Sequence, residues 1–171
     1  GRSVGRRGAV APGSAWALVT GAGSGIGRCY ALRLAALGYN LVLAGNRREP
    51  LETVCSEILA AGAGPDGGVR KAASPAAGFR PEVRIVEIEA AAELWEAVRR
   101  EGAAIDVLVN NAGIFSFRDI LQTPAERIER IILLHDLTNT QLCRMAAADM
   151  VRRAEPRRYL FLKITYDKKR T

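Results

Sequence analysis

A glycine-rich segment near the start of the chain, Gly21-Ala-Gly-Ser-Gly25-Ile-Gly27, constrains the possible folds more than any other feature. It follows the apolar run 16–20 and precedes a segment with Leu32, Leu34 and Leu37 at roughly helical spacing. This order predicts a strand, a tight turn and a helix. Because glycine lacks a Cβ atom, the backbone can turn sharply there and approach another group closely.

The alternation of strand and helix continues along the chain. We expect further strands at 41–44, 83–88, 105–109 and 159–164, and further helices at 49–61, 91–100 and 124–153, the last capped by Thr123. Residues 62–81 are rich in small residues, glycine and proline, and predict a long loop. This spacing predicts an α/β fold with a Rossmann-like, doubly wound parallel sheet of strand order 3-2-1-4-5.

The net charge of +7 is concentrated at the two ends of the chain. Residues 1–15 hold three Arg and no acid, and residues 144–171 hold nine Lys or Arg and three acids. The body between them carries 13 basic and 15 acidic groups. A nucleic-acid-binding domain usually carries its basic stripe on the folded body, so this distribution disfavours nucleic-acid binding. Binding of an acidic partner by the basic tail is the alternative to a solvated end.

The cysteine pattern and the apolar runs exclude several classes of protein. Cys29, Cys55 and Cys143 are widely separated and form no pattern typical of a disulfide framework or a zinc site. No apolar run approaches the roughly 18 residues that a membrane span needs. We therefore expect a cytoplasmic protein without metal or membrane contact. Residues 1–15 predict a flexible basic leader, with the remnant of an organelle-import peptide as the alternative.

The glycine turn lies where a sheet of this class can bind a dinucleotide. Gly21 and Gly25 would let the backbone approach a pyrophosphate, whose charge the first N–H groups of the following helix would meet. Gly27 would let that helix pack close to the sheet. We place Ser24 and Ile26 at the same pyrophosphate. The alternative is a turn that binds no ligand.

Two motifs in this order resemble the short-chain dehydrogenase/reductase family. They are Thr20-Gly-x-x-x-Gly25-x-Gly27 after the first strand and Asn110-Asn-Ala-Gly113 at the end of the fourth. The similarity predicts one Rossmann domain over 16–165 and leaves 166–171 as a divergent basic tail. The resemblance implies hydride transfer between a nicotinamide cofactor and a carbonyl or alcohol. In that family the second motif steadies the sheet and lines the cofactor, which implies contacts with adenosine and ribose from Asn110, Ala112 and Gly113.

The end of the second strand predicts NADP(H) rather than NAD(H). An acid there would bond the ribose hydroxyls of NAD, but the chain has Gly45-Asn46-Arg47-Arg48. Guanidinium groups pair well with phosphate, so we expect Arg47, with Arg48, at the 2′-phosphate. The family often has Arg where Asn46 stands, and the alternative is a pair of solvent-facing Arg that begin the next helix. Glu89 falls near the family's adenine-side Asp.

The resemblance also implies catalytic residues that this sequence does not supply. The family uses a Tyr, a Lys four residues later and a Ser about thirteen residues earlier. Tyr166 has Arg170 and Arg153 at those distances, and neither can perform the required role. If Thr165 is aligned with the Ser instead, the Tyr falls near position 178, beyond Thr171. We therefore expect no catalytic residue in this chain and a sheet that is incomplete at its C-terminal side.

The predicted helix over 124–153 departs from the family's proton relay as well. Asp136 stands at the position of the relay Asn, and the lone His135 is expected to be a structural or surface side chain rather than a catalyst. Together these features favour an oxidoreductase cut short by truncation, splicing or a frameshift, with a small-molecule carbonyl or alcohol substrate if complete. The alternative is a nucleotide-binding pseudoenzyme or regulatory subunit. A homo-oligomer, or pairing with a full-length relative, is compatible with both.

Overall fold

The computed structural model describes residues 11–61, 79–87, 90–114, 116 and 119–153, and the backbone of 160–163. The expected leader lies largely outside these residues. So do most of the expected loop over 62–81 and the whole of the expected tail over 166–171.

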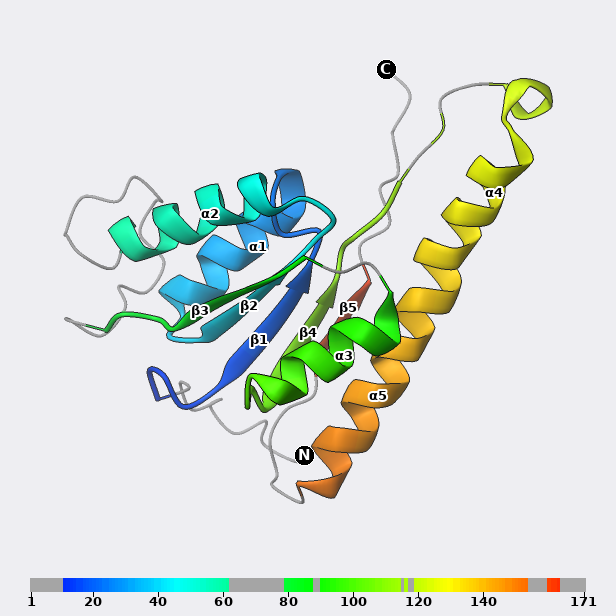
Figure 1. Cartoon of the computed structure of the whole chain (residues 1–171). Coiled ribbons are helices and arrows are strands. Elements are labelled where there is room, and N and C mark those ends of the chain that lie inside the picture. The colour runs from blue at the N-terminus through cyan, green and yellow to red at the C-terminus, as the bar shows by residue number, and fades with distance from the viewer. Residues whose placement is uncertain are drawn as a thin grey trace, which may run out of the picture.

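Five strands form one parallel sheet (Figure 1). They are β1 (Trp16–Thr20), β2 (Asn40–Ala44), β3 (Val83–Val86), β4 (Ile105–Asn110) and β5 (Leu160–Lys163). Their order is β3-β2-β1-β4-β5, so the core order β3-β2-β1-β4 predicted from the alternation is confirmed. Because all strands run in the same direction, their carboxyl ends meet at one edge of the sheet, here called the carboxyl edge.

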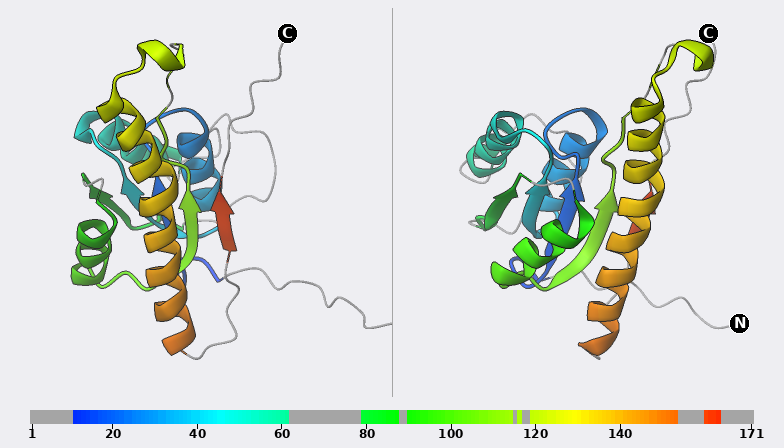
Figure 2. Two further views of the ribbon diagram at one scale, coloured as in Figure 1. Left: turned by 90° about the vertical axis from the view of Figure 1, so that its right-hand side faces the viewer. Right: turned by 45° about the vertical axis from the view of Figure 1, so that its right-hand side comes forward.

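Helices cover both faces of the sheet (Figures 1 and 2). They are α1 (Gly25–Ala36) and α2 (Arg48–Ala61) on one face, and α3 (Ala91–Arg100) and α5 (Asn139–Arg152) on the other. A fifth helix, α4 (Ala125–Ile132), precedes α5 and does not cover the sheet. Side chains along β1 alternate between two cores: Ala17 and Val19 pack with α1 and α2, whereas Leu18 packs with α3 and α5. Because both faces of the sheet are buried, side chains on both sides of each strand are apolar, and the strands appear in the sequence as continuous apolar runs.

The helix expected over 124–153 is continuous but not uniform. A π segment (Leu133–Thr138) separates α4 from α5. A π turn has a wider hydrogen-bond spacing than an α-helix, and apolar periodicity does not reveal it.

The predicted cap of this helix is wrong. Pro124, not Thr123, is the N-cap residue of α4. Thr123 is instead the C-cap residue of the short 3₁₀ helix Ile120–Gln122, and its hydroxyl donates to the Asp119 carbonyl oxygen at 2.9 Å.

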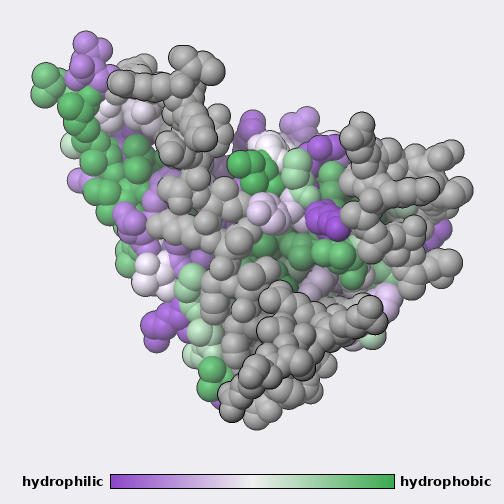
Figure 3. Space-filling model, turned by 180° about the vertical axis from the view of Figure 1, so that it is seen from behind, coloured by the Kyte–Doolittle hydropathy of each residue, from purple (hydrophilic) through white to green (hydrophobic). Residues whose placement is uncertain are grey.

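The α4 end of this long helix projects beyond the carboxyl edge of the sheet (Figures 1 and 2). Ile132 and Leu133 are about half exposed there, and apolar side chains line much of the projecting end in Figure 3. Within the described ranges, no helix combines the length and the apolarity that crossing a bilayer would require.

Candidate dinucleotide site

The turn between β1 and α1 has the backbone that its glycines permit. Gly21 and Gly25 have φ angles of 63° and 53°, in the left-handed region that favours glycine. A Cβ atom on Gly27 would lie 2.2 Å from the Gly21 carbonyl oxygen, so only glycine allows α1 to begin this close to the turn. A Cβ atom on Gly25 would meet nothing within 4 Å, so the turn is open on that side.

The first turn of α1 presents polar groups at this opening. Ser24 is the N-cap residue with an extended backbone, and its side chain makes no capping hydrogen bond. Ser24, Gly25 and Ile26 are exposed. The N–H groups of a first helical turn have no intrahelical acceptors and carry the positive end of the helix dipole. The opening therefore suits an anion such as a pyrophosphate.

Thr20 connects the two sequence motifs in space. Its Oγ1 accepts hydrogen bonds from the backbone N–H groups of Asn111 and Ala112, each at 3.0 Å. The Asn111 side-chain amide in turn donates to the carbonyl oxygens of Thr20 and Gly21, each at 3.2 Å. Sequence reasoning assigned no role to the side chain of Thr20 or Asn111, and their place inside the motifs was the available signal. These bonds fix the glycine turn to the loop after β4.

We expect Thr20→Val to destabilise the protein by about 2 kcal/mol, because the partly buried N–H groups of Asn111 and Ala112 would lose their acceptor. Urea denaturation measures the change. Thr20→Ser keeps the hydroxyl and is expected to lose roughly 1 kcal/mol or less. Equal losses in the two variants would contradict a role for the hydroxyl.

Residues of the second motif, 110–113, make contacts with different parts of the protein. The Asn110 side chain is buried and donates to the Asn139 carbonyl oxygen at 3.3 Å and to the Cys143 sulfur at 3.2 Å. It therefore holds α5 against β4. Gly113 packs against the ring of His135, where a Cβ atom would lie 2.6 Å from Cε1. Contacts of Asn110, Ala112 and Gly113 with adenosine and ribose stay a prediction.

The two arginines at the end of β2 differ in their surroundings. Arg48 is paired with Glu52 one turn later in α2, with Nε 2.7 Å from Oε1. Arg47 is exposed and forms no ion pair with any described residue. Its guanidinium is therefore better placed than that of Arg48 to meet a phosphate at the carboxyl edge.

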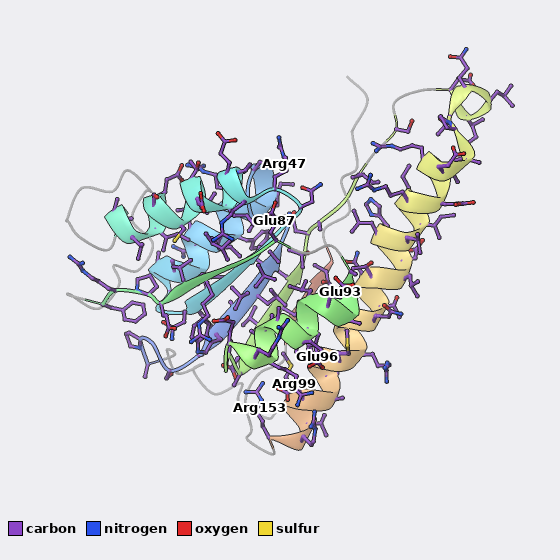
Figure 4. All side chains as sticks on the ribbon, viewed as in Figure 1. Arg47, Glu87, Glu93, Glu96, Arg99 and Arg153 are labelled. Carbon is purple, nitrogen blue, oxygen red and sulfur yellow. The ribbon has the colours of Figure 1, made fainter. Side chains whose placement is uncertain are left out.

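Two acids follow β3 in the sequence, and the structure describes one of them. Glu89 lies outside the described residues. Glu87 directly follows the last residue of β3 and is exposed, and its neighbour Val86 accepts a hydrogen bond from the Gly45 N–H at 3.2 Å. Figure 4 shows Glu87 and Arg47 at the same edge. Sequence reasoning did not consider Glu87, because the strand was predicted over 83–88 and β3 ends at Val86 instead.

Among the described residues, the titratable groups away from the turn provide no second candidate ligand site. Burial, and secondarily Glu52, raises the pKa of the Cys55 thiol, which lies on α2 and stays protonated at neutral pH. Asp136 is exposed on the π segment. Thr165 and Tyr166 lie outside the described residues. Among the residues that the structure describes, no group of three or more His, Cys, Asp or Glu could hold a metal ion.

The residues present fit a dinucleotide. The turn offers an open cradle at Gly25, the first turn of α1 offers N–H groups and the Ser24 hydroxyl, and Arg47 offers a positive charge beyond the end of β2. Thr20 and Asn111 hold the cradle to the loop after β4. All of these groups lie at the carboxyl edge, where open α/β sheets bind ligands.

Comparisons with known proteins agree with this arrangement. The chain is 29% identical over 156 residues to the very-long-chain 3-oxoacyl-CoA reductase of Anas platyrhynchos, covering 87% of this chain and 45% of the relative. It is 32% identical over 145 residues to the reductase of the same description from Mycosarcoma maydis, covering 82% and 37%. The chain thus spans less than half the length of these relatives.

Solved structures share the fold. A short-chain dehydrogenase from Sphingobium yanoikuyae in complex with NADPH is 30% identical with a TM-score of 0.62, covering 81% of this chain and 49% of that one. The bulky-bulky ketone specific alcohol dehydrogenase from Comamonas testosteroni is 25% identical with a TM-score of 0.65, covering 81% and 51%. The family description short chain dehydrogenase matches residues 15–157. The chain therefore belongs to the short-chain dehydrogenase family of oxidoreductases.

Proposed function

We propose that this chain binds NADP(H) through the turn 21–27 and forms the cofactor side of a carbonyl or alcohol oxidoreductase. The observation that carries the proposal is the open turn at Gly25, which is held to the loop after β4 by Thr20 and Asn111. Membership of the family and the NADPH complex of the Sphingobium yanoikuyae relative support it. Bound NADPH would supply the hydride that reduces a carbonyl.

Each part of the site has a separate task in this proposal. The N–H groups at the start of α1 and the Ser24 hydroxyl bind the pyrophosphate, and Ile26 covers it from the first turn. Arg47 binds the 2′-phosphate, and the absence of an acid at the end of β2 removes the repulsion that would exclude it. Glu89 is the acid that we place at the adenine side, and the exposed Glu87 stands two residues before it in the sequence, directly after β3. The substrate class, a ketone, aldehyde or alcohol, follows from the family and not from a described pocket.

Arg47→Ala is expected to weaken NADPH binding about tenfold and to leave NADH binding unchanged, because one charge-assisted hydrogen bond contributes roughly 1.5 kcal/mol. Calorimetric titration at fixed ionic strength measures both dissociation constants. Arg48→Ala is the matched control, since Arg48 is engaged with Glu52. If Arg47→Ala weakens NADPH binding no more than Arg48→Ala does, or weakens NADH binding as much as NADPH binding, the assignment of Arg47 to the 2′-phosphate is wrong.

A nucleotide-binding subunit without turnover is the second candidate. It is favoured by Asp136, an exposed acid at the position where the resemblance implies a relay Asn. A panel of simple ketones and aldehydes with NADPH distinguishes the two candidates. Oxidation of NADPH above the rate without substrate supports the oxidoreductase, whereas tight NADPH binding without oxidation supports the second candidate.

A further inference from the structure

The loop that follows β4 is held at two points. Thr20 of β1 binds its beginning, at the N–H groups of Asn111 and Ala112. His135 binds its end: the imidazole Nε2 lies 3.2 Å from the Ile114 nitrogen and 3.0 Å from the Ile114 carbonyl oxygen. The first contact belongs to the family motif, whereas the second comes from a helix residue outside both motifs.

The His135 ring also packs directly against the loop. Its Cε1 would lie 2.6 Å from a Cβ atom on Gly113, and its Nε2 would lie 3.0 Å from the same atom. Glycine at position 113 is therefore what allows the imidazole to reach Ile114. The ring thus both fills the space between the loop and the helix and hydrogen-bonds to the loop.

A chain of hydrogen bonds fixes the backbone that carries His135. The Asn139 side-chain amide donates to the His135 carbonyl oxygen at 2.9 Å, inside the helix region where the π segment meets α5. The Asn110 amide donates to the Asn139 carbonyl oxygen at 3.3 Å. Both asparagines are more than nine-tenths buried. The bonds thus run from Asn110 at the end of β4 through α5 and His135 back to Ile114, four residues after Asn110.

We propose that His135 is a positioning residue, whose imidazole holds the backbone of Ala112, Gly113 and Ile114 where bound NADP(H) needs it. This inference rests on the proposed function. One nitrogen faces both a donor and an acceptor of Ile114, so the tautomer decides which bond forms. With the proton on Nδ1, Nε2 accepts from the Ile114 N–H group. With the proton on Nε2, it donates to the Ile114 carbonyl oxygen.

Substitutions separate this role from simple filling of space. Phenylalanine has a ring of similar size but cannot hydrogen-bond, whereas glutamine can both donate and accept. We expect His135→Phe to weaken NADPH binding roughly five- to tenfold, the loss of about one hydrogen bond. His135→Gln is expected to restore binding to within about twofold of the wild type. Thr140→Ala, an exposed change on the same helix, is the control and is expected to have no effect.

Nitrogen NMR of the unsubstituted chain tests the inference without any variant. The sequence contains a single histidine, so labelling with ¹⁵N-histidine yields only its own two ring signals. We expect the Nε2 signal to shift as NADPH is added, and to saturate at the dissociation constant measured by calorimetry. The shift also reports which tautomer binds Ile114.

The outcomes distinguish failure of the proposed function from failure of the positioning role of His135. If the wild-type chain binds no NADPH, the proposed function and this inference both fail. If NADPH binds but the Nε2 signal does not move, or His135→Phe binds as well as the wild type, the positioning role fails and the proposed function stands.

Discussion

Gly27→Ala is expected to lower the free energy of unfolding by about 2–3 kcal/mol, although alanine is the better helix former. The new methyl group would lie 2.2 Å from the Gly21 carbonyl oxygen and 2.5 Å from the Asn111 amide nitrogen. Neither atom can move without breaking the bonds that fix the turn to the loop after β4. The energetic cost of this clash thus exceeds the roughly 1 kcal/mol by which alanine stabilises a helix relative to glycine. Urea denaturation followed by circular dichroism measures the change.

Two further glycine substitutions separate strain from loss of the site. Gly25→Ala and Gly102→Ala both place a side chain at positive φ with nothing within 4 Å, so each is expected to cost about 1–2 kcal/mol. Gly102 lies after α3, away from the turn. Only Gly25→Ala places a methyl group in the open cradle, so only this variant is expected to weaken NADPH binding more than tenfold. Equal NADPH affinity in these two variants would count against the cradle.

Arg153→Ala is expected to lower the free energy of unfolding by about 2–3 kcal/mol, somewhat less than for a fully buried ion pair because Arg153 is partly exposed. Its Nη1 lies 3.2 Å from Oδ1 of Asp106, which is 7% exposed at the start of β4. The other oxygen of Asp106 accepts from the Trp16 N–H at 3.0 Å. Without Arg153, a buried carboxylate keeps that hydrogen bond but loses its guanidinium partner. Figure 4 shows Arg153 near the end of α5, opposite the carboxyl edge.

The neighbouring residue provides the control for this prediction. Arg152 is mostly exposed and lies 3.5 Å from Asp149, so Arg152→Ala is expected to change stability by less than about 0.5 kcal/mol. In Arg153→Ala/Asp106→Asn the buried charge is absent while the amide oxygen still accepts from Trp16. This double variant should recover about half of the loss, roughly 1 kcal/mol or more. A loss as small as that of Arg152→Ala would show that the pair adds little stability.

Apolar spacing was enough to predict the strands and the α-helical regions of the fold, but not the π segment or the short 3₁₀ helix. The helix over 91–100 was predicted with the bounds that the structure has, and β1 begins and ends where the first apolar run does. Parallel order followed from the alternation of strands and helices, since right-handed crossovers leave few arrangements. The apolar residues of these elements form the two cores, so the pattern and the packing carry the same information.

Long-range polar contacts were beyond sequence reasoning. Asn111 bonds to Thr20 across 91 positions, and Asn110 bonds to Asn139 across 29. Such bonds depend on where folded elements meet, which residue types alone do not specify. A similar ambiguity arises within a short segment at Thr123. Its hydroxyl could accept from an N–H group of the following helix, as a cap does, or donate to a preceding carbonyl oxygen, and it donates to that of Asp119. Arg47 and Arg48 looked alike in sequence, and only the ion pair of Arg48 with Glu52 separates them.

Calorimetric titration of the 171-residue chain with NADPH and with NADH tests the central claim most directly. The account predicts saturable binding of one NADPH per chain, with a dissociation constant at least about tenfold lower than that of NADH. Failure of both cofactors to bind, or tighter binding of NADH, would contradict it.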